Sequence, residues 1–208
     1  MKILFTGDSI TASGRDQANK SDLGHGFALM MSEMITESFP ECEFTFYNTG
    51  VPGNRAEQLA LRLDTDLTAL EPELTVLMIG VNDAWCRFCI DRVITDDDFE
   101  ESTRTILEAA RSLGSAVVVL EPYLFPDEKH FPAFAELDGK IRVLRKLSRE
   151  YADAYVALHG AFAEQIVTRD WTDFSVDGVH PNETGARFIA EKAIAAVLPI
   201  IKNKLANS

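Results

Sequence analysis

Short runs of β-branched and other apolar residues alternate with segments of helical periodicity along the whole sequence. Runs of about four to eight such residues, bounded by turn residues, are typical of buried strands. The five predicted strands are Lys2–Thr6, Phe44–Thr49, Leu74–Gly80, Ala116–Glu121 and Ala154–Leu158. Strands that alternate with helices form a parallel sheet covered on both faces and joined by right-handed crossovers. The alternation therefore predicts an α/β fold, in one domain spanning residues 1–208, because no linker, repeat or low-complexity tract interrupts it.

The segments between the predicted strands carry apolar residues at helical spacing. A series of leucines at three- and four-residue steps predicts one helix, and its members are Leu59, Leu63, Leu67 and Leu70. Thr95 predicts the N-cap of a further helix, which should end at Gly114. A last helix is predicted over residues 183–204, and Pro199 should kink or end it because proline lacks a backbone N–H.

Acidic residues outnumber basic ones, 33 to 20, and the formal net charge is −13. Such a surface repels phosphate backbones and anionic lipids, so neither a nucleic acid nor a membrane is expected as a partner. No apolar run approaches the roughly 20 residues needed to span a bilayer. The first residues turn polar too early for the apolar region of a signal peptide, which predicts a cytoplasmic protein. A neutral small molecule would meet no electrostatic barrier.

Cysteine and histidine are sparse, and no metal site or cofactor is predicted from them. The three cysteines are Cys42, Cys86 and Cys89, and a cytoplasmic protein would keep them reduced. The four histidines are scattered singly, whereas a zinc site needs about four ligands at short spacings. The Trp-Cys-x-x-Cys spacing of residues 85–89 nevertheless leaves a dithiol redox centre as an alternative reading of this segment.

Polar residues follow three of the predicted strands, and another polar group precedes the last helix. Open parallel sheets bind ligands beyond the carboxyl ends of their strands, so these residues are candidates for a site. Each group taken alone has an ordinary explanation as a turn or a helix cap. The four groups are Gly7-Asp8-Ser9, Gly50-Val51-Pro52-Gly53-Asn54, Gly80-Val81-Asn82-Asp83 and Asp177-Gly178-Val179-His180.

Taken together, the four groups contain the parts of an acyl-transfer site. A serine hydroxyl is a weak nucleophile and needs a base held in place by a carboxylate, roles for which Ser9, His180 and Asp177 are available. The three-residue spacing of Asp177 and His180 lets both lie on one side of a turn. The backbone N–H groups of Ser9 and Gly53 and the side-chain amide of Asn82 are the candidate oxyanion donors. The glycine at position 53 would permit a positive φ or a close approach to substrate.

These four groups, in this order and at this spacing, resemble the sequence blocks of the SGNH (GDSL) hydrolases, named after Ser, Gly, Asn and His. The resemblance covers residues 7–185 and assigns those positions to Ser9, Gly53, Asn82 and His180, with Asp177 completing the triad. It implies a flavodoxin-like three-layer α/β/α sandwich with a five-stranded parallel sheet. It also implies a cofactor-free serine esterase. The G-x-S-x-G elbow of the α/β-hydrolases does not occur in the sequence.

A narrower resemblance links the sequence to the cytosolic acetylxylan-esterase branch, which removes acetyl groups from xylo-oligosaccharides. It implies an acetylated sugar as the substrate and leaves homo-oligomerisation open, because relatives of this branch commonly assemble. Pro52 and the segment 86–89 depart from the branch pattern, which leaves the sugar undetermined. The segments that carry the resemblance are GDSITASGR, LGHGF, NTGVPGNRAEQLALR and IGVNDAW.

Alternative functions remain open at this point. A lysophospholipase or acyl-thioesterase would act on longer acyl chains, and a sugar O-acyltransferase would pass the acyl group to another sugar. A binding module that has lost catalysis is a further alternative, which the complete set of triad and oxyanion residues disfavours. The redox reading of residues 86–89 is also disfavoured, because Asn82 is placed at the strand end and the cysteines in the loop that follows.

Three residues near the strand ends are predicted to bind substrate. They are Asp8, Trp85 and Tyr123. Trp85 could cover the apolar face of a sugar ring, with a core or subunit contact as the alternative, and Asp8 could instead make a loop hydrogen bond. Of the other histidines, His159 is predicted to be structural. His25 and His130 lie in loop-like segments, are expected to have no carboxylate at triad spacing, and are predicted to be surface residues.

Overall fold

The computed structural model describes residues 1–207, and within them lies a five-stranded sheet in the order β2-β1-β3-β4-β5. Every neighbouring pair of strands in this sheet is parallel. The predicted strands are confirmed, with ends that differ by no more than two residues. The strands are β1 (Lys2–Gly7), β2 (Thr45–Asn48), β3 (Leu74–Met78), β4 (Ala116–Leu120) and β5 (Ala154–Val156).

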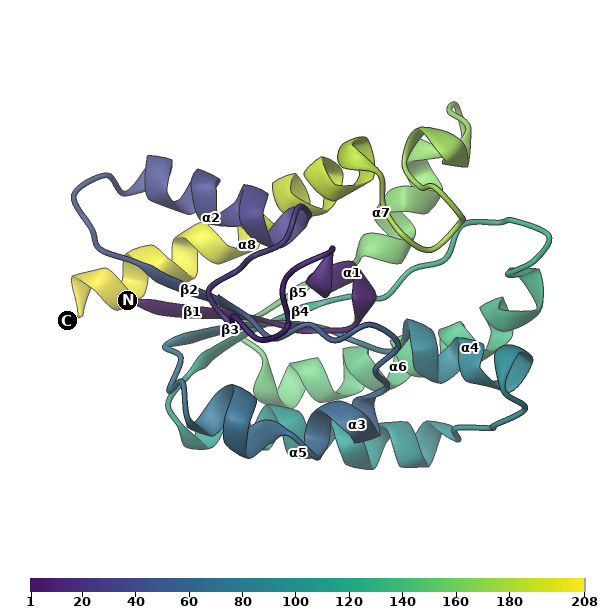
Figure 1. The fold of residues 1–208 in the computed structure, drawn as a ribbon, viewed down its shortest axis with the longest axis horizontal. Coiled ribbons are helices and arrows are strands. Elements are labelled where there is room, and N and C mark those ends of the chain that lie inside the picture. The colour runs from purple at the N-terminus through teal and green to yellow at the C-terminus, as the bar shows by residue number, and fades with distance from the viewer. Residues whose placement is uncertain (208) are drawn as a thin grey trace.

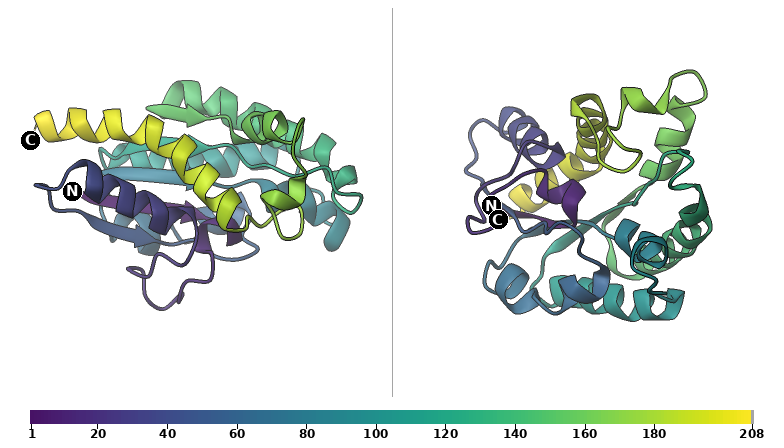
Figure 2. Two further views of the ribbon diagram at one scale, coloured as in Figure 1. Left: turned by 90° about the horizontal axis from the view of Figure 1, so that it is seen from above. Right: turned by 45° about the vertical axis from the view of Figure 1, so that its right-hand side comes forward.

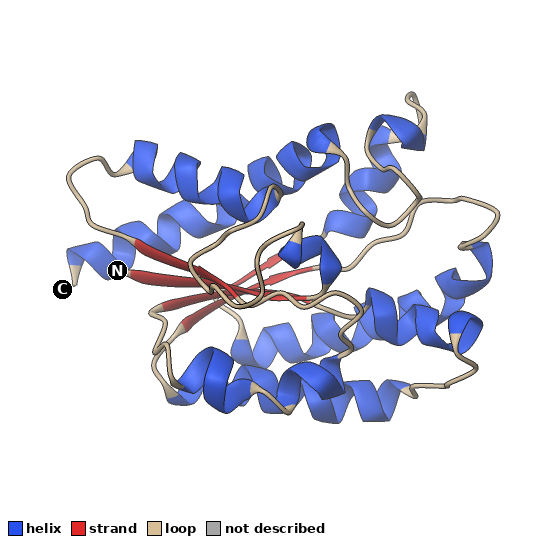
Figure 3. Ribbon diagram, viewed as in Figure 1, coloured by secondary structure: helices blue, strands red, loops and turns tan. Residues whose placement is uncertain are grey.

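Helices cover both faces of the sheet, so the predicted three-layer α/β/α arrangement is confirmed (Figures 1 and 3). One layer contains α2 (Phe27–Ser38), α7 (Leu158–Gln165) and α8 (Glu183–Ala206). The other contains α3 (Ala56–Ala60), α4 (Val81–Cys89), α5 (Asp96–Ser112) and α6 (Phe134–Tyr151). The additional views show the sheet between these two layers (Figure 2).

Side chains of β1 alternate between two hydrophobic clusters, one on each face of the sheet. Ile3 and Phe5 are fully buried in the cluster that includes residues of α2 and α8. Leu4, between them, is buried in the cluster formed with α3, α5 and α6. This alternation follows from the two-residue period of a strand, and it explains why the predicted strands read as continuous apolar runs.

Two of the helical predictions have different outcomes. Thr95 caps α5 as expected: its hydroxyl accepts a hydrogen bond from the backbone N–H of Asp98, and the Asp98 carboxylate accepts one from the backbone N–H of Thr95. The single helix predicted from the leucines is wrong, because α3 ends at Ala60 and a separate π-helical turn, η1, spans Asp64–Thr68. Leu61, in the break, is 87% exposed.

The last helix agrees with its predicted range to within two residues. α8 runs from Glu183 to Ala206 with Pro199 inside it, so of the two effects expected of this proline, an end to the helix is wrong. Proline removes the hydrogen bond to the carbonyl four residues earlier, which here belongs to Ala195. Both residues are exposed, so water can satisfy that carbonyl while the opposite face of the helix, with Ala193 and Val197, stays buried.

Different segments of the chain lie at the two ends of the sheet. The chain termini lie close together near the amino ends of the strands (Figures 1 and 2). The short helix α1 (Ser9–Ala12) and α4 begin at the opposite edge, where β1 and β3 end. In residues 1–207, no helix has both the length and the apolar character required to cross a membrane.

Candidate active site

Ser9 follows β1 directly and is the first residue of α1. Asp8 caps this helix, because its Oδ1 accepts a hydrogen bond of 2.9 Å from the backbone N–H of Ile10. The strand end and the cap together fix the backbone at Ser9. The Ser9 Oγ then lies 2.9 Å from Nε2 of His180, a residue that is far away in the sequence.

His180 lies in the loop before α8 and is oriented by Asp177. Its Nδ1 is 2.7 Å from Asp177 Oδ2. Asp177 Oδ1 accepts hydrogen bonds from the backbone N–H groups of Val179, at 3.0 Å, and His180, at 2.7 Å. A carboxylate beside Nδ1 favours the tautomer with the proton on that nitrogen, which leaves Nε2 free to accept the Ser9 proton. The structure thus brings the three predicted triad residues into one line of hydrogen bonds.

The charge of Asp177 follows from the same contacts. Partial burial raises the pKa of this carboxyl group, but the side-chain and backbone hydrogen bonds from His180 and the backbone hydrogen bond from Val179 outweigh burial. The pKa of Asp177 therefore lies below its ordinary value. The carboxylate stays ionised at neutral pH and can stabilise a positively charged imidazolium beside it.

The three predicted oxyanion residues line one cavity with His180 and Asp177, and its volume is about 290 Å³. Gly53 has φ of +77° in the loop between β2 and α3, which explains the glycine at this position. Asn82 lies in the first turn of α4, where its Nδ2 donates a hydrogen bond of 3.1 Å to the backbone carbonyl of Asn54. The loop that carries Gly53 is therefore linked to the end of β3.

Asp83 makes a second link between the same two segments. Both of its carboxylate oxygens accept a hydrogen bond from the backbone N–H of Ala56, at 3.1 and 3.2 Å. Burial raises the pKa of Asp83 to about 6, against the opposing effect of this backbone hydrogen bond. Asp83 thus positions the loop of Gly53 and does not line the cavity. The sequence pattern alone does not distinguish its role from that of its neighbour Asn82.

Trp85, Lys129 and His130 form the wall of the cavity beyond Asn82. The Trp85 ring contacts the His130 ring at a centroid distance of 4.7 Å, and the Lys129 Nζ lies 6.0 Å from the Trp85 centroid. Trp85 is therefore in the position expected of a substrate-contacting residue. Lys129 and His130 are cavity residues that the sequence analysis missed.

The structure does not place Asp8 and Tyr123 at the cavity, although both are predicted to bind substrate. Asp8 is 1% exposed and Tyr123 is 0% exposed. Burial raises the pKa of Asp8 to about 7 and also raises the pKa of Tyr123. The predicted contact of these two residues with substrate is therefore wrong: Asp8, directly after β1, and Tyr123, three residues after the end of β4, are both buried in the core.

The remaining histidines differ in burial. His25 is exposed, as expected. The predicted surface position of His130 is wrong, because it is 2% exposed. Asp127 stands three residues before it, so the expected lack of a carboxylate at triad spacing is also wrong. Asp22 has the same spacing from the exposed His25, so the spacing alone does not indicate burial. His159 lies away from this cavity, and its backbone N–H donates a hydrogen bond to Glu121.

Cys86 and Cys89 lie in α4 rather than in a loop, which corrects their predicted position. Cys86 is buried, and its thiol donates a hydrogen bond to the backbone carbonyl of Arg92. Burial raises the pKa of this thiol, whereas a redox-active cysteine needs a lowered one. Within residues 1–207, no group of three or more His, Cys, Asp or Glu side chains is arranged to hold a metal ion.

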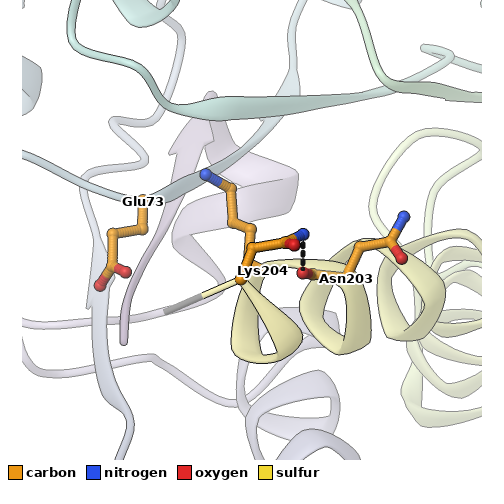
Figure 4. Close-up of a pocket in the computed structure, with 4 residues that line it drawn as sticks. Glu73, Asn203 and Lys204 are labelled. Carbon is orange, nitrogen blue, oxygen red and sulfur yellow. Dashed lines mark hydrogen bonds between the residues drawn. The ribbon is translucent and has the colours of Figure 1, made fainter.

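A second pocket near the chain termini has almost the same volume, about 280 Å³. Glu73, Asn203 and Lys204 line it beside the end of α8 (Figure 4). The residues around it supply neither a hydroxyl or thiol nucleophile nor a histidine. Cavity volume therefore does not distinguish the two sites, whereas the chemistry of their side chains does.

The arrangement at the carboxyl ends of the strands suits acyl transfer. A hydroxyl, a base hydrogen-bonded to it, a carboxylate that orients the base, and several N–H donors surround one cavity. These are the groups needed to form and stabilise a tetrahedral intermediate.

Comparison with known proteins agrees with this chemistry. The GDSL-like lipase/acylhydrolase family matches residues 5–188. An acetylxylan esterase from Geobacillus stearothermophilus is 26% identical over 197 residues, which cover 91% of this chain and 90% of that protein.

Solved structures show the same fold. A putative GDSL-like lipase from Parabacteroides merdae has a TM-score of 0.88 and 28% identity, with 94% of each chain covered. Axe2, an acetylxylan esterase from Geobacillus stearothermophilus, has a TM-score of 0.87 and 25% identity, with 95% of this chain and 94% of that chain covered.

Proposed function

The chain belongs to the GDSL-like lipase/acylhydrolase family and is a carboxylic ester hydrolase, and we propose that Ser9, His180 and Asp177 are its catalytic triad. Ser9 Oγ attacks the ester carbonyl while His180 Nε2 takes its proton, and Asp177 orients and stabilises the resulting imidazolium. His180 then donates that proton to the departing alcohol and activates a water molecule to hydrolyse the acyl-enzyme. The observation that carries this proposal is the hydrogen-bond line Asp177–His180–Ser9, with distances of 2.7 and 2.9 Å.

The oxyanion of the tetrahedral intermediate is stabilised by the backbone N–H groups of Ser9 and Gly53 and the side-chain amide of Asn82. Support for this assignment comes from their position around one cavity with His180. The hydrogen bond from Asn82 to Asn54 uses only one of the two amide protons, so the other remains for substrate.

The substrate that the observations favour is an acetyl ester of a carbohydrate. The similarity to an acetylxylan esterase supports the acetylated sugar. The cavity of about 290 Å³ lies at the lower limit of ordinary ligand pockets, which favours a small acyl group over a long chain. Trp85 offers an aromatic edge to the alcohol part of the substrate.

The test is hydrolysis of p-nitrophenyl esters of increasing acyl length, from acetate to octanoate, by the wild type and Ser9→Ala. We expect fast cleavage of the acetate, a steep fall in kcat/KM towards octanoate, and no activity in the variant. A preference for octanoate would replace the acetyl ester with lipid or thioester substrates. Full activity in Ser9→Ala would overturn the nucleophile.

The acyltransferase alternative is tested with the same protein. An acetylated sugar is incubated in water with a second, unacetylated sugar, and free acetate is compared with newly acetylated sugar. Acetate as the main product supports hydrolysis, whereas a larger yield of the new ester would show that transfer is the main reaction.

A further inference from the structure

A second Asp-x-x-His segment, Asp127 to His130, lies against the same cavity as the proposed triad. The triad does not use it. His130 is nevertheless 2% exposed, an unusual environment for a histidine in a connecting segment with little secondary structure. A buried polar ring that faces a ligand cavity requires an explanation.

Contacts on several sides fix the orientation of the His130 ring. The Trp85 ring packs against it at 4.7 Å, and its Nδ1 lies 3.3 Å from Asp127 Oδ2. Gly178 leaves room for it, because a Cβ atom at that residue would lie only 2.8 Å from Nδ1. The backbone N–H of His130 donates to the carbonyl of Asp127 at 3.0 Å. The ring is therefore held in place before any substrate binds.

The two ring nitrogens of His130 have different surroundings. Nδ1 is fully buried and lies 3.3 Å from the Asp127 carboxylate without a well-aligned hydrogen bond to it. Nε2 is not among the fully buried atoms, and no side chain or backbone group within the described residues 1–207 hydrogen-bonds it. Because His130 lines the cavity, Nε2 is the nitrogen available to a bound ligand.

The ionisation of His130 determines what Nε2 can bind. Burial lowers the pKa of His130, and although the nearby Asp127 and Asp177 carboxylates oppose this, the net shift is downward. The ring is therefore neutral at neutral pH. The Asp127 carboxylate beside Nδ1 favours the tautomer that carries its proton there, so that Nε2 presents a lone pair and accepts a hydrogen bond.

We propose that His130 determines specificity for the alcohol part of the substrate, because its Nε2 accepts a hydrogen bond from a free hydroxyl group on a polyhydroxylated alcohol. An acetyl group has no hydroxyl, so the hydrogen-bond donor must belong to the alcohol part. The inference rests on the proposed esterase function and refines it: Ser9 and His180 cleave the ester, and His130 selects which alcohol carries it.

The test compares two acetates on the same ring, one with free hydroxyl groups and one without. Methyl xylopyranoside monoacetate supplies the hydroxyl groups, and the acetate of hydroxytetrahydropyran has the same ring without them. The kcat/KM of each is measured for the wild type, for His130→Ala and for His130→Gln, whose side-chain oxygen can still accept a hydrogen bond. His25→Ala, an exposed histidine outside the cavity, is the matched control.

We expect His130→Ala to lower kcat/KM for the xyloside acetate by about tenfold to hundredfold, the usual effect of leaving a bound polar group without its partner. In the same variant, kcat/KM for the hydroxyl-free acetate should change by less than about threefold. His25→Ala should leave kcat/KM for both acetates unchanged. His130→Gln should recover part of the loss on the xyloside acetate. If the role of His130 were purely structural, His130→Ala would lower kcat/KM for both substrates by the same factor.

Three results would overturn the inference: equal losses on both acetates, no loss on either, or a wild type that does not cleave the xyloside acetate. Ser9→Ala separates these from a failure of the proposed function. Suppose that Ser9→Ala is inactive on the hydroxyl-free acetate, while His130→Ala has the same ratio of kcat/KM for the two acetates as the wild type. In that case only the role of His130 fails. If Ser9→Ala remains active, the proposed function itself fails.

Discussion

Two of the three Asp-x-x-His segments of this protein, Asp127 to His130 and Asp177 to His180, face the same cavity, but their environments differ. Asp177 lies 2.7 Å from its histidine, compared with 3.3 Å for Asp127. The His180 side chain is 45% exposed, whereas that of His130 is 3% exposed.

The difference shows what the spacing alone does not determine. A three-residue spacing brings a carboxylate and an imidazole together in both segments. Only His180 also reaches a hydroxyl, because Ser9 lies 2.9 Å from its Nε2. The hydrogen bonds from the His180 side chain and from the backbone N–H groups of His180 and Val179 keep the Asp177 carboxylate ionised, as general base catalysis by its histidine requires. The position of the nucleophile therefore distinguishes the proposed catalytic pair from the substrate-binding one.

Removal of each histidine gives the largest expected contrast between the two segments. His180→Ala should lower kcat on p-nitrophenyl acetate by about 10⁵- to 10⁶-fold, the usual effect of removing a triad base. His130→Ala should lower it by less than about threefold, because this ester has no hydroxyl group for Nε2 to bind. Steady-state kinetics of the purified variants measure both. Similar losses of kcat in the two variants would show that His180 and His130 do not have the different roles proposed here.

Neutralising each carboxylate sharpens the comparison further. Asp177→Asn should lower kcat by about 10⁴-fold, because an amide does not stabilise the imidazolium and can favour the wrong tautomer of His180. Asp127→Asn should change kcat on p-nitrophenyl acetate only by a small factor. The measurement is kcat at neutral pH, with circular dichroism of both variants to check folding. A large loss in Asp127→Asn would assign this second carboxylate to the chemical step.

Asn82→Ala tests one of the proposed oxyanion donors. Loss of one oxyanion donor should lower kcat by about 10²- to 10³-fold. Unlike the loss from His130→Ala, this loss should be equal for esters with and without hydroxyl groups on the alcohol, since every ester forms the same oxyanion. The readout is kcat on both acetates. Unchanged turnover would remove Asn82 from the oxyanion hole.

Asp8 extends the comparison to a third carboxyl group, whose pKa is shifted in the opposite direction from that of Asp177. Burial raises the pKa of Asp8 to about 7 in the folded protein, against an ordinary value of 3.8. The folded state thus binds the proton more tightly than the unfolded state, and Asp8 costs stability as the pH rises from about 4 to about 7.

Asp8→Asn removes this dependence. The free energy of unfolding of the variant minus that of the wild type should rise with pH over this range, by at most about 1.4 kcal/mol per pH unit. Urea unfolding at several pH values gives this difference, and any constant cost of the asparagine cancels from its slope. A difference that does not vary with pH would show that the pKa of Asp8 is not raised.

The fold and the proposed triad could be predicted because both depend on regular patterns. The apolar runs predict the strands, and a parallel sheet brings the residues after its strands to one edge, which places Ser9 and Asn82 together. Asp177 and His180 precede a well-marked helix. The break between α3 and η1 was not predictable from leucine spacing, because Leu59, Leu63 and Leu67 keep four-residue steps across it.

The burial of His130 could not be predicted in the same way. Its segment has no strand or long-helix periodicity, and the residues that bury it come from distant parts of the chain. Trp85 belongs to α4, whereas Gly178 lies in the loop before α8. The spacing to Asp127 was visible in the sequence, but neither the contact with Trp85 nor the space left by Gly178 was.

Gly178 connects the two segments, and its substitution should affect both. Its φ is +87°, and its carbonyl accepts a hydrogen bond from the backbone N–H of Phe125, at the start of the segment that carries His130. A Cβ atom there would lie 2.8 Å from His130 Nδ1, and that ring is already held by Trp85. Gly178→Ala therefore adds both backbone strain and a clash.

We expect Gly178→Ala to lower the free energy of unfolding by about 1–3 kcal/mol and kcat/KM on the xyloside acetate by about tenfold, with a smaller loss on the hydroxyl-free acetate. Urea unfolding and the two-acetate assay measure these effects. Gly160→Ala is the matched control, because Gly160 lies exposed in α7 with no atom within 4 Å of an added Cβ, and alanine favours a helix. Equal stability of the two variants would show that the segment carrying His130 moves aside freely. The ring would then not be held in place by the loop that carries Asp177 and His180.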